Sequence, residues 1–250
     1  LISRAKGFPI DVLYLRDDDI PQAVAMGVAD IGIVGQNEVG EKEENVEEVM
    51  ALGFGKCRLS IAVPKHSDYN GPAWLNGRSI ATSYPVLLKK WLDENNVEAK
   101  IHVITGSVEI APAVGMADAI FDIVSTGNSL VQNGLSEVEQ VMHSEAVMIC
   151  NPELSEEKRA DLDKLMFRFS SIVNSRGMKY VLMNVPEKSL DKAVALLPGL
   201  KSPTILPLFD KGWFSVHAVI RQNELWEKIE QLKEIGAEDI LILSLENIIN

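Results

Sequence analysis

The sequence predicts an α/β protein whose first part has parallel sheets covered by helices and whose last part has the element order βαββαβ. Short apolar runs alternate with helical patterns up to residue 175, as is typical of sheets covered by helices. After residue 178 the order of the elements changes. The composition agrees with a globular protein, because 46% of the 250 residues are hydrophobic and 24% are charged. This length suggests one large domain or two ordinary ones.

The first predicted helix has a distinct start. Asp17, Asp18 and Asp19 precede Pro21. Acidic side chains in a first turn favour the helix dipole, and a proline there costs no hydrogen bond. We expect this helix to end near Gly27. Around it the sequence predicts a strand over 10–15, a short buried strand over 30–34, a solvated loop or helix end over the glutamate-rich 41–48, and strands over 49–54 and 58–63.

The second block of elements repeats this alternation around an amphipathic helix. The helical pattern over 84–95 places Leu87, Leu88, Trp91 and Leu92 on one face. The further elements expected here are strands over 79–82, 100–104 and 119–124, and a long helix over 155–175 that Ser155 caps. Each of the three strands runs directly into a turn rich in polar residues.

The last part of the chain has the order of a ferredoxin-like domain. Asp210, Lys211 and Gly212 are typical of a tight turn between two paired strands. The predicted elements are a strand over 179–185, a helix over 187–197, strands over 203–208 and 213–220, a helix over 223–235 and a strand over 240–245. This βαββαβ order is that of the split βαβ unit. We expect the domain boundary near 176–178.

The turn after the predicted strand 119–124 is the strongest candidate for ligand binding. The hydroxyls of Ser125, Thr126 and Ser129, with free N–H groups at a helix start, suit a phosphate. Gly127 allows a close approach of the backbone to the ligand. Asp122 is suited to a ribose hydroxyl or to Mg²⁺. Taken alone, these residues fit an ordinary helix cap better than a phosphate site, because Ser and Thr are favoured there.

Two further turns of the same kind add weight to this candidate. They are Thr82-Ser83-Tyr84-Pro85 and Gly106-Ser107-Val108-Glu109. The carboxyl ends of the strands in an open α/β sheet lie along one edge, where ligands bind. The three turns together therefore predict one cleft for a phosphorylated ligand.

Composition and motifs argue against several other classes of protein. The formal net charge of -12 disfavours a broad nucleic-acid surface. No apolar run reaches the roughly 18 residues that a transmembrane helix needs. Cys57 and Cys150 do not make a disulfide scaffold, and so few cysteines favour a reducing, cytoplasmic setting. The four histidines lack metal-ligand spacing, so no metal held by the protein alone is expected. Walker, G-x-G-x-x-G and G-x-S-x-G motifs are absent.

At these turns the sequence resembles ATP phosphoribosyltransferase, in the long form that carries a C-terminal regulatory domain. The resemblance covers nearly the whole chain in the family's order. The segments that carry it are Leu15-Arg-Asp-Asp-Asp-Ile-Pro21, Ala29-Asp-Ile-Gly-Ile-Val-Gly35, Asn76-Gly-Arg-Ser-Ile-Ala-Thr-Ser-Tyr-Pro85, Gly106-Ser-Val-Glu-Ile-Ala-Pro112, Ala117-Asp-Ala-Ile-Phe-Asp-Ile-Val-Ser-Thr-Gly-Asn-Ser-Leu130 and Lys201-Ser-Pro-Thr-Ile-Leu-Pro207.

The resemblance implies a two-lobed catalytic part, like the type II periplasmic binding proteins, followed by the ferredoxin-like domain. Lobe one would comprise 1–65 and 145–176. Lobe two, which binds phosphoribosyl pyrophosphate (PRPP), would comprise 66–144, and the regulatory domain 179–250. The chain opens at Leu1, and we expect the family's first strand and first basic glycine-containing loop to be missing. Without that loop, activity is expected to be impaired.

The resemblance also implies the reaction and its site. The adenine N1 of ATP would attack the anomeric carbon of PRPP, with Mg²⁺ on the pyrophosphate that leaves. Asp122 and Glu109 are the residues implied to be catalytic. The PRPP phosphate and ribose would be held by Asp122, Ser125, Thr126, Gly127, Asn128 and Ser129, and the nucleotide would lie near Ser83 and Tyr84. The family commonly has Thr or a small residue at the positions of Asn128 and Ser129, so phosphate binding is expected to persist.

The C-terminal domain of this family binds histidine as a feedback inhibitor of histidine biosynthesis, at a site built between subunits. The resemblance therefore implies a homo-oligomer, active as a dimer and inhibited as a hexamer. The positions that match the effector pocket are Leu200, Thr204, Val219 and Asp239. Packing or capping in a small α/β domain explains each of these residues about as well.

Two other functions compete with this enzyme. A non-catalytic two-lobed protein that binds a small anion or an amino acid has the same strand-to-helix turns, and a fold does not fix a function. A regulatory module with a degenerate catalytic part is the other alternative. The residues at 122–129 and the appended domain favour the enzyme, because a solute-binding protein has no evident need of either.

Overall fold

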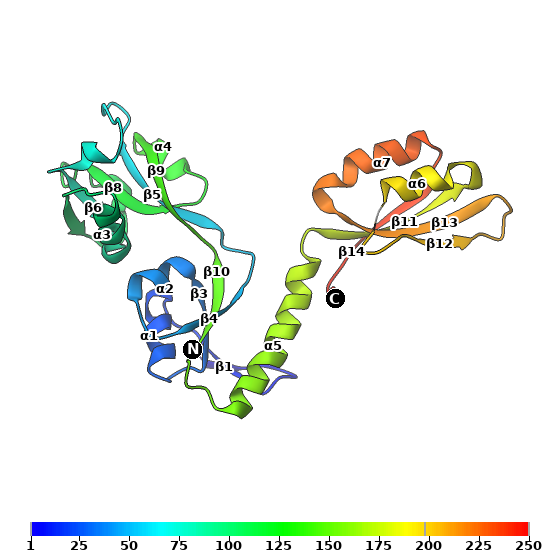
Figure 1. Cartoon of the computed structure of the whole chain (residues 1–250), viewed down its shortest axis with the longest axis horizontal. Coiled ribbons are helices and arrows are strands. Elements are labelled where there is room, and N and C mark those ends of the chain that lie inside the picture. Colours follow the sequence, from blue (N-terminus) through cyan, green and yellow to red (C-terminus); the bar gives the residue numbers. More distant parts are fainter. Residues whose placement is uncertain (1, 198, 250) are drawn as a thin grey trace. The chain divides into compact units, whose positions relative to one another are not determined.

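The computed structural model describes residues 2–197 and 199–249 (Figure 1). Its contacts divide the chain into two compact units, Leu1–Asp161 and Leu162–Asn250. This division falls inside helix α5 (Glu156–Ser175) and not at 176–178, where the sequence predicts a boundary. The division into two lobes and a regulatory domain, with the bounds given above, stays a prediction. Among the helices of these residues, none has the length and apolarity to cross a membrane.

The first unit contains a three-stranded antiparallel sheet. Its strand order is β3 (Ile31–Gly35), β10 (Ala146–Cys150) and β4 (Glu47–Ala51). The central strand returns from much later in the chain and runs antiparallel to both neighbours, so the parallel pairing expected from the alternation is wrong here. Helices α1 (Ile20–Ala25) and α2 (Gln36–Lys42) pack beside it, and β1 (Ile2–Arg4) pairs with β2 (Asp11–Leu13). The buried core of this three-stranded sheet consists of Val24, Val34, Val147 and Ile149.

The second sheet of this unit has five strands. Their order is β7 (Lys100–Val103), β6 (Ser79–Thr82), β8 (Ala119–Val124), β5 (Cys57–Pro64) and β9 (Leu135–Ser144). Strands β7, β6 and β8 are parallel, whereas β5 runs antiparallel to both β8 and β9. The chain passes between the two sheets twice, from β4 to β5 and from β9 to β10. These two crossings give the unit its two lobes.

Both faces of the five-stranded sheet are covered. On one face Leu59, Ile80 and Phe121 pack against α3 (Pro85–Glu94), whose Leu88 and Leu92 are buried as the sequence predicts. The core on the other face consists of Ala62, Ala81, Val108, Ala111, Ala117, Ile120, Val124, Leu130 and Leu135. This second core holds α4 (Asn128–Gln132) and the turn before it beside the sheet.

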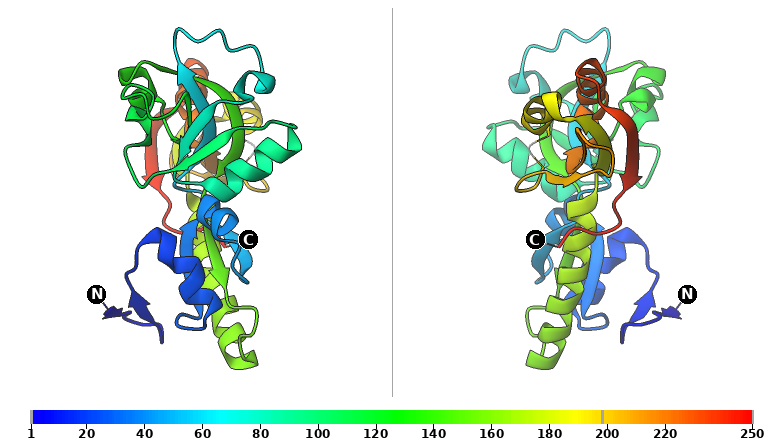
Figure 2. Two further views of the ribbon diagram at one scale, coloured as in Figure 1. Left: turned by 90° about the vertical axis from the view of Figure 1, so that its left-hand side faces the viewer. Right: turned by 90° about the vertical axis from the view of Figure 1, so that its right-hand side faces the viewer.

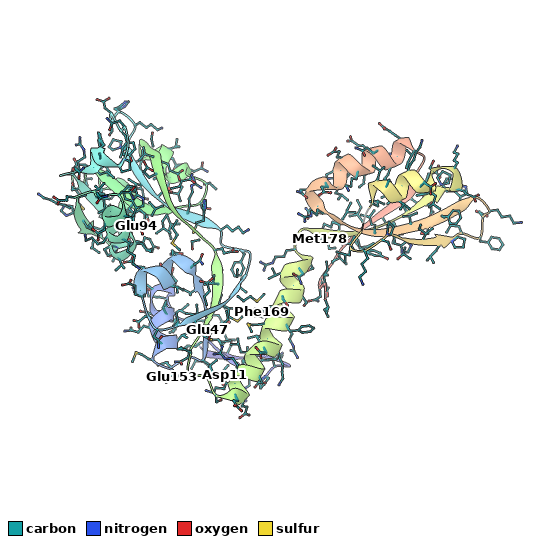
Figure 3. The ribbon with its side chains drawn as sticks, viewed as in Figure 1. Asp11, Glu47, Glu94, Glu153, Phe169 and Met178 are labelled. Carbon is teal, nitrogen blue, oxygen red and sulfur yellow. The ribbon has the colours of Figure 1, made fainter. Side chains whose placement is uncertain are left out.

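The second unit has the predicted βαββαβ order. Its strand order is β12 (Thr204–Pro207), β13 (Trp213–Arg221), β11 (Met178–Pro186) and β14 (Glu238–Ser244). Met178, labelled in Figure 3, begins β11 shortly after α5 ends. Figure 2 shows α6 (Leu190–Leu196) and α7 (Leu225–Glu234) on the same face of this sheet. Val181, Met183, Val216 and Leu232 form part of the core beneath them.

Candidate active site

Three polar turns meet at one edge of the five-stranded sheet. Because β7, β6 and β8 are adjacent and parallel, their carboxyl ends lie along the same edge. The turn after β6 contacts the end of β7, since the Ser83 hydroxyl donates to the Ile104 carbonyl (2.7 Å). The turn after β7 becomes a short 3-10 helix (Val108–Ile110) and not the α-helix expected. The turn after β8 leads into α4.

The turn over 125–129 presents its polar side chains to solvent. Ser125, Thr126, Asn128 and Ser129 are exposed. Gly127 adopts a φ of 80°, which glycine tolerates far better than other residues, and immediately precedes α4. The hydroxyls and amides at this helix start are therefore accessible to an anionic ligand.

Asp122 places a carboxylate near this turn, two residues before the end of β8. Burial raises the pKa of Asp122 to about 6, and the charge of Glu109 adds to this rise. The Ile123 N–H donates to its Oδ1 (2.8 Å) and opposes the shift. In the part of the chain that the structure describes, no lysine or arginine forms an ion pair with Asp122. The two residues implied to be catalytic, Asp122 and Glu109, thus lie close enough to interact electrostatically.

The two residues implied to contact the nucleotide have protein partners. Ser83 is half-buried, with its hydroxyl bonded to Ile104 as described. Tyr84 is 9% exposed, and its hydroxyl accepts from Asn37 Nδ2 of α2 (3.4 Å). Burial, followed by the charge of Glu38, raises the pKa of the Tyr84 hydroxyl. Burial likewise raises the pKa of Glu38.

Two residues that hold segments near the site by hydrogen bonds were not identified from the sequence. Glu41 of α2 is buried and accepts from the amides of Val86 and Leu87 (2.9 Å each), which caps α3. Arg58 of β5 donates to the carbonyl of Ser125 (3.1 Å). Neither residue stands in a recognisable motif, because each acts on a segment far away in the sequence.

The described residues contain no cluster of three or more His, Cys, Asp or Glu side chains that could hold a metal ion. Mg²⁺ keeps several waters and takes one or two protein carboxylates together with substrate phosphates. Asp122 is a half-buried carboxylate without a cationic partner among the described residues, and it fits this way of binding Mg²⁺.

The four implied effector positions do not form one pocket within a single chain. Thr204 faces His217 across the strand pair, and Val219 lies two residues further on, so both share a sheet face. Asp239 belongs to β14, at the opposite edge of the sheet, where it accepts from Asn184 Nδ2 (2.9 Å). Leu200 is exposed in the segment before β12.

Comparisons with known proteins agree with the resemblance. The ATP phosphoribosyltransferase family profile matches residues 16–171, and that of the HisG C-terminal domain matches residues 175–247. Proteins named ATP phosphoribosyltransferase from Bacteroides thetaiotaomicron and Parabacteroides distasonis are each 56% identical to the chain over 249 residues. These alignments cover 100% of this chain and 88% of each relative.

The fold has a counterpart among solved structures. A chain of the ATP phosphoribosyl transferase (HisG:HisZ) complex from Thermotoga maritima superposes with a TM-score of 0.61 at 24% identity. The match covers 70% of this chain and 87% of that one. The predicted fold class, the resemblance and the enzyme class are confirmed by these comparisons. The chain therefore belongs to the ATP phosphoribosyltransferase family.

Proposed function

We propose that this chain transfers the 5-phosphoribosyl group of PRPP to N1 of the adenine of ATP. The products are N1-(5-phosphoribosyl)-ATP and pyrophosphate, and the reaction is the first step of histidine biosynthesis. The observation that carries this proposal is the exposed 125–129 turn beside Asp122, in a chain of this family. Because the three turns lie along one sheet edge, the two substrates can bind there next to each other.

The 125–129 turn binds the 5′-phosphate and the ribose of PRPP in this proposal. Backbone N–H groups from Thr126 to Ser129 and the hydroxyls of Ser125, Thr126 and Ser129 supply the donors. Asn128 adds an amide side chain. Gly127 carries no Cβ, so the phosphate is able to approach the backbone there. Asp122 accepts from a ribose hydroxyl.

The chemistry follows from where charge develops. As the bond from C1′ to the pyrophosphate oxygen breaks and the bond from N1 to C1′ forms, the ribose ring becomes more positive and the leaving group more negative. Asp122 has a pKa of about 6, so it is ionised at neutral pH, and Glu109 adds a second negative charge nearby. Both stabilise the positive ribose. The adenine nucleophile is neutral, so the attack needs no strong base.

Mg²⁺ is proposed to enter with PRPP. Bound to the pyrophosphate, it would neutralise charge on the leaving group. Asp122 is the protein residue best suited to contact that ion, directly or through water. The turn around Ser83 and Tyr84 is proposed to bind ATP. Tyr84 is buried, and Glu41 already accepts from the amides at the start of α3, so half-buried Ser83 is the residue of this turn proposed to contact the nucleotide directly.

Regulation by histidine is proposed for the second unit. Leu200, Thr204, Val219 and Asp239 would contribute to the effector site. Thr204 and Asp239 lie on the two edge strands, so about 14 Å of sheet width separates their strands. This separation supports a site completed by a second subunit, in an oligomer that changes from dimers to hexamers. The two free cysteines favour a reducing, cytoplasmic setting.

Product formation tests the proposal directly. The full chain is mixed with ATP, PRPP and Mg²⁺, and the ultraviolet absorbance of the product is followed. We expect turnover, with Thr126→Val raising the KM for PRPP because the hydroxyl is lost at nearly constant shape. Thr126→Ser, which keeps the hydroxyl, is the matched control and should retain most of the affinity. No turnover by the intact chain, together with no heat on titrating PRPP, would leave the non-catalytic binding protein as the better interpretation.

Calorimetric titration with L-histidine tests the regulatory part separately. We expect heat that saturates, together with a shift toward the larger oligomer in analytical ultracentrifugation. Asp239→Asn should weaken the binding. Absence of heat at millimolar histidine would contradict the proposed effector site, and the catalytic proposal would be unaffected.

A further inference from the structure

An arginine on β5 connects the 125–129 turn to the body of the sheet. Arg58 pairs with Val124 in the ladder between β5 and β8, so it lies where β8 gives way to the turn. Its Nη1 donates to the carbonyl oxygen of Ser125 at 3.1 Å. The other side of the guanidinium binds Glu137 of β9 with two hydrogen bonds, 2.5 Å from Nε and 2.6 Å from Nη2.

The carboxylate of Glu137 is itself held in place. The Ser60 hydroxyl, on the same strand as Arg58, donates to Glu137 Oε1 at 2.7 Å. Hydrogen bonding by Arg58 is the main reason that the pKa of Glu137 is lowered. Both side chains are only about a fifth exposed, at 23% for Arg58 and 21% for Glu137. A bidentate pair of this kind fixes the plane of the guanidinium, which a single contact would leave free to turn.

The contact with Ser125 determines the direction of a different group. The carbonyl of Ser125 and the N–H of Thr126 belong to one planar trans peptide, so they point in opposite directions. Fixing the carbonyl toward Arg58 therefore fixes the Thr126 N–H away from it. Thr126 begins the group of donors to which the proposed function assigns the phosphate.

We propose that Arg58, held by Glu137, is a positioning residue that sets the peptide between Ser125 and Thr126 for phosphate binding. The inference rests on the proposed function, because it assigns the turn's amides to PRPP. Arg58 itself touches the protein and not the phosphate. Positioning before the ligand arrives lowers the ordering cost of binding and holds the ribose in the geometry for attack.

The test compares Arg58→Gln with Arg58→Lys. Glutamine removes the positive charge and the planar guanidinium group that binds two acceptors at once. Lysine keeps a positive charge but offers no planar group that bridges Glu137 and Ser125 together. We expect Arg58→Gln to weaken PRPP binding by about 10- to 100-fold, the value of one hydrogen bond to a charged group, while the KM for ATP stays within about twofold. Arg58→Lys should lie between this variant and the wild type.

Arg159→Gln is the matched control. Arg159 also pairs with a glutamate, Glu47 (2.9 Å), but does so beside the other sheet. It should lose similar stability and keep wild-type kinetics. Circular dichroism checks that each variant is folded. Hydrogen exchange measured by mass spectrometry on the ligand-free proteins should show faster exchange over 125–129 in Arg58→Gln and not in Arg159→Gln.

The outcomes separate the two proposals. Wild-type PRPP binding by a folded Arg58→Gln, or unchanged exchange of the turn, would overturn the positioning role. If the wild type itself bound no PRPP, the proposed function would fail, and the exchange rates of the ligand-free turn would still decide whether Arg58 orders it.

Discussion

Replacing Asp122 by asparagine should stabilise the ligand-free protein and at the same time impair catalysis. The folded protein raises the pKa of Asp122 from 3.8 to about 6, chiefly through burial. A raised folded pKa means that this carboxyl favours folding fully below about pH 4 and loses that contribution as the pH rises through 6. The difference of about 2 pKa units corresponds to about 3 kcal/mol above pH 6, as an upper figure.

Asparagine has nearly the same shape, keeps an oxygen that accepts from the Ile123 N–H, and carries no charge. We therefore expect Asp122→Asn to be more stable than the wild type by about 1–3 kcal/mol at pH 8. Most of this difference in the free energy of unfolding should disappear between pH 6 and pH 4. Urea unfolding at pH 4, 5, 6 and 8 measures this. Trp213→Phe and Trp226→Phe in the background leave Trp74 and Trp91 to report on the first unit.

Asp118 supplies a control of opposite sign. It accepts from the Ser79 N–H and from the Ser79 hydroxyl (2.8 Å each), and these bonds lower its pKa. Its stabilising contribution is therefore present above its unfolded pKa and is lost as the pH falls. Asp118→Asn should be less stable than the wild type at pH 8. An Asp122→Asn variant that is destabilised at pH 8, or whose gap from the wild type is the same at pH 4 and pH 8, would refute the reasoning.

Three further predictions concern the turn, a helix cap and the second unit. Gly127→Ala must adopt a φ of 80°, so it should cost about 1 kcal/mol and weaken PRPP binding in calorimetry; unchanged affinity would argue against a constrained turn. Glu41→Ala leaves two amides of α3 unpaired and should cost about 1–3 kcal/mol in urea unfolding, whereas exposed Glu43→Ala should cost under about 1 kcal/mol. Leu232→Ala, at a fully buried position, should lower the free energy of unfolding of the second unit by about 2–5 kcal/mol and leave turnover by the first unit unchanged. An equal shift of the unfolding transitions of both units would contradict this.

Elements with a strong local pattern were predictable from the sequence. The strands over 79–82 and 119–124 agree with β6 and β8 at both ends, and the buried face of α3 follows its apolar spacing. The βαββαβ order of the second unit was equally accessible, because its strands alternate and its helices are amphipathic. The placing of three turns at one edge followed from the expectation of parallel strands, which holds for β7, β6 and β8.

Elements defined by distant partners were not predictable. The sequence did not indicate β9, whose register with β5 includes two irregularities and whose residues are largely polar. Helix α2 (Gln36–Lys42) was not predicted from the sequence, which indicated only a solvated loop or helix end over the glutamate-rich 41–48. In the structure Asn37, Glu38 and Glu41 form its buried side, and their partners come from α3 and β9. Arg58 was missed for the same reason, since its partners lie 67 and 79 residues away.

The central claim is that the amides of the 125–129 turn bind the phosphate of PRPP. Backbone amide chemical shifts of the isotope-labelled protein, recorded while PRPP and Mg²⁺ are added, test it most directly. We predict that the amides of Thr126, Gly127 and Asn128 shift in a saturable way, and that ribose 5-phosphate alone moves the same signals. Saturable shifts confined to other parts of the chain would contradict the account.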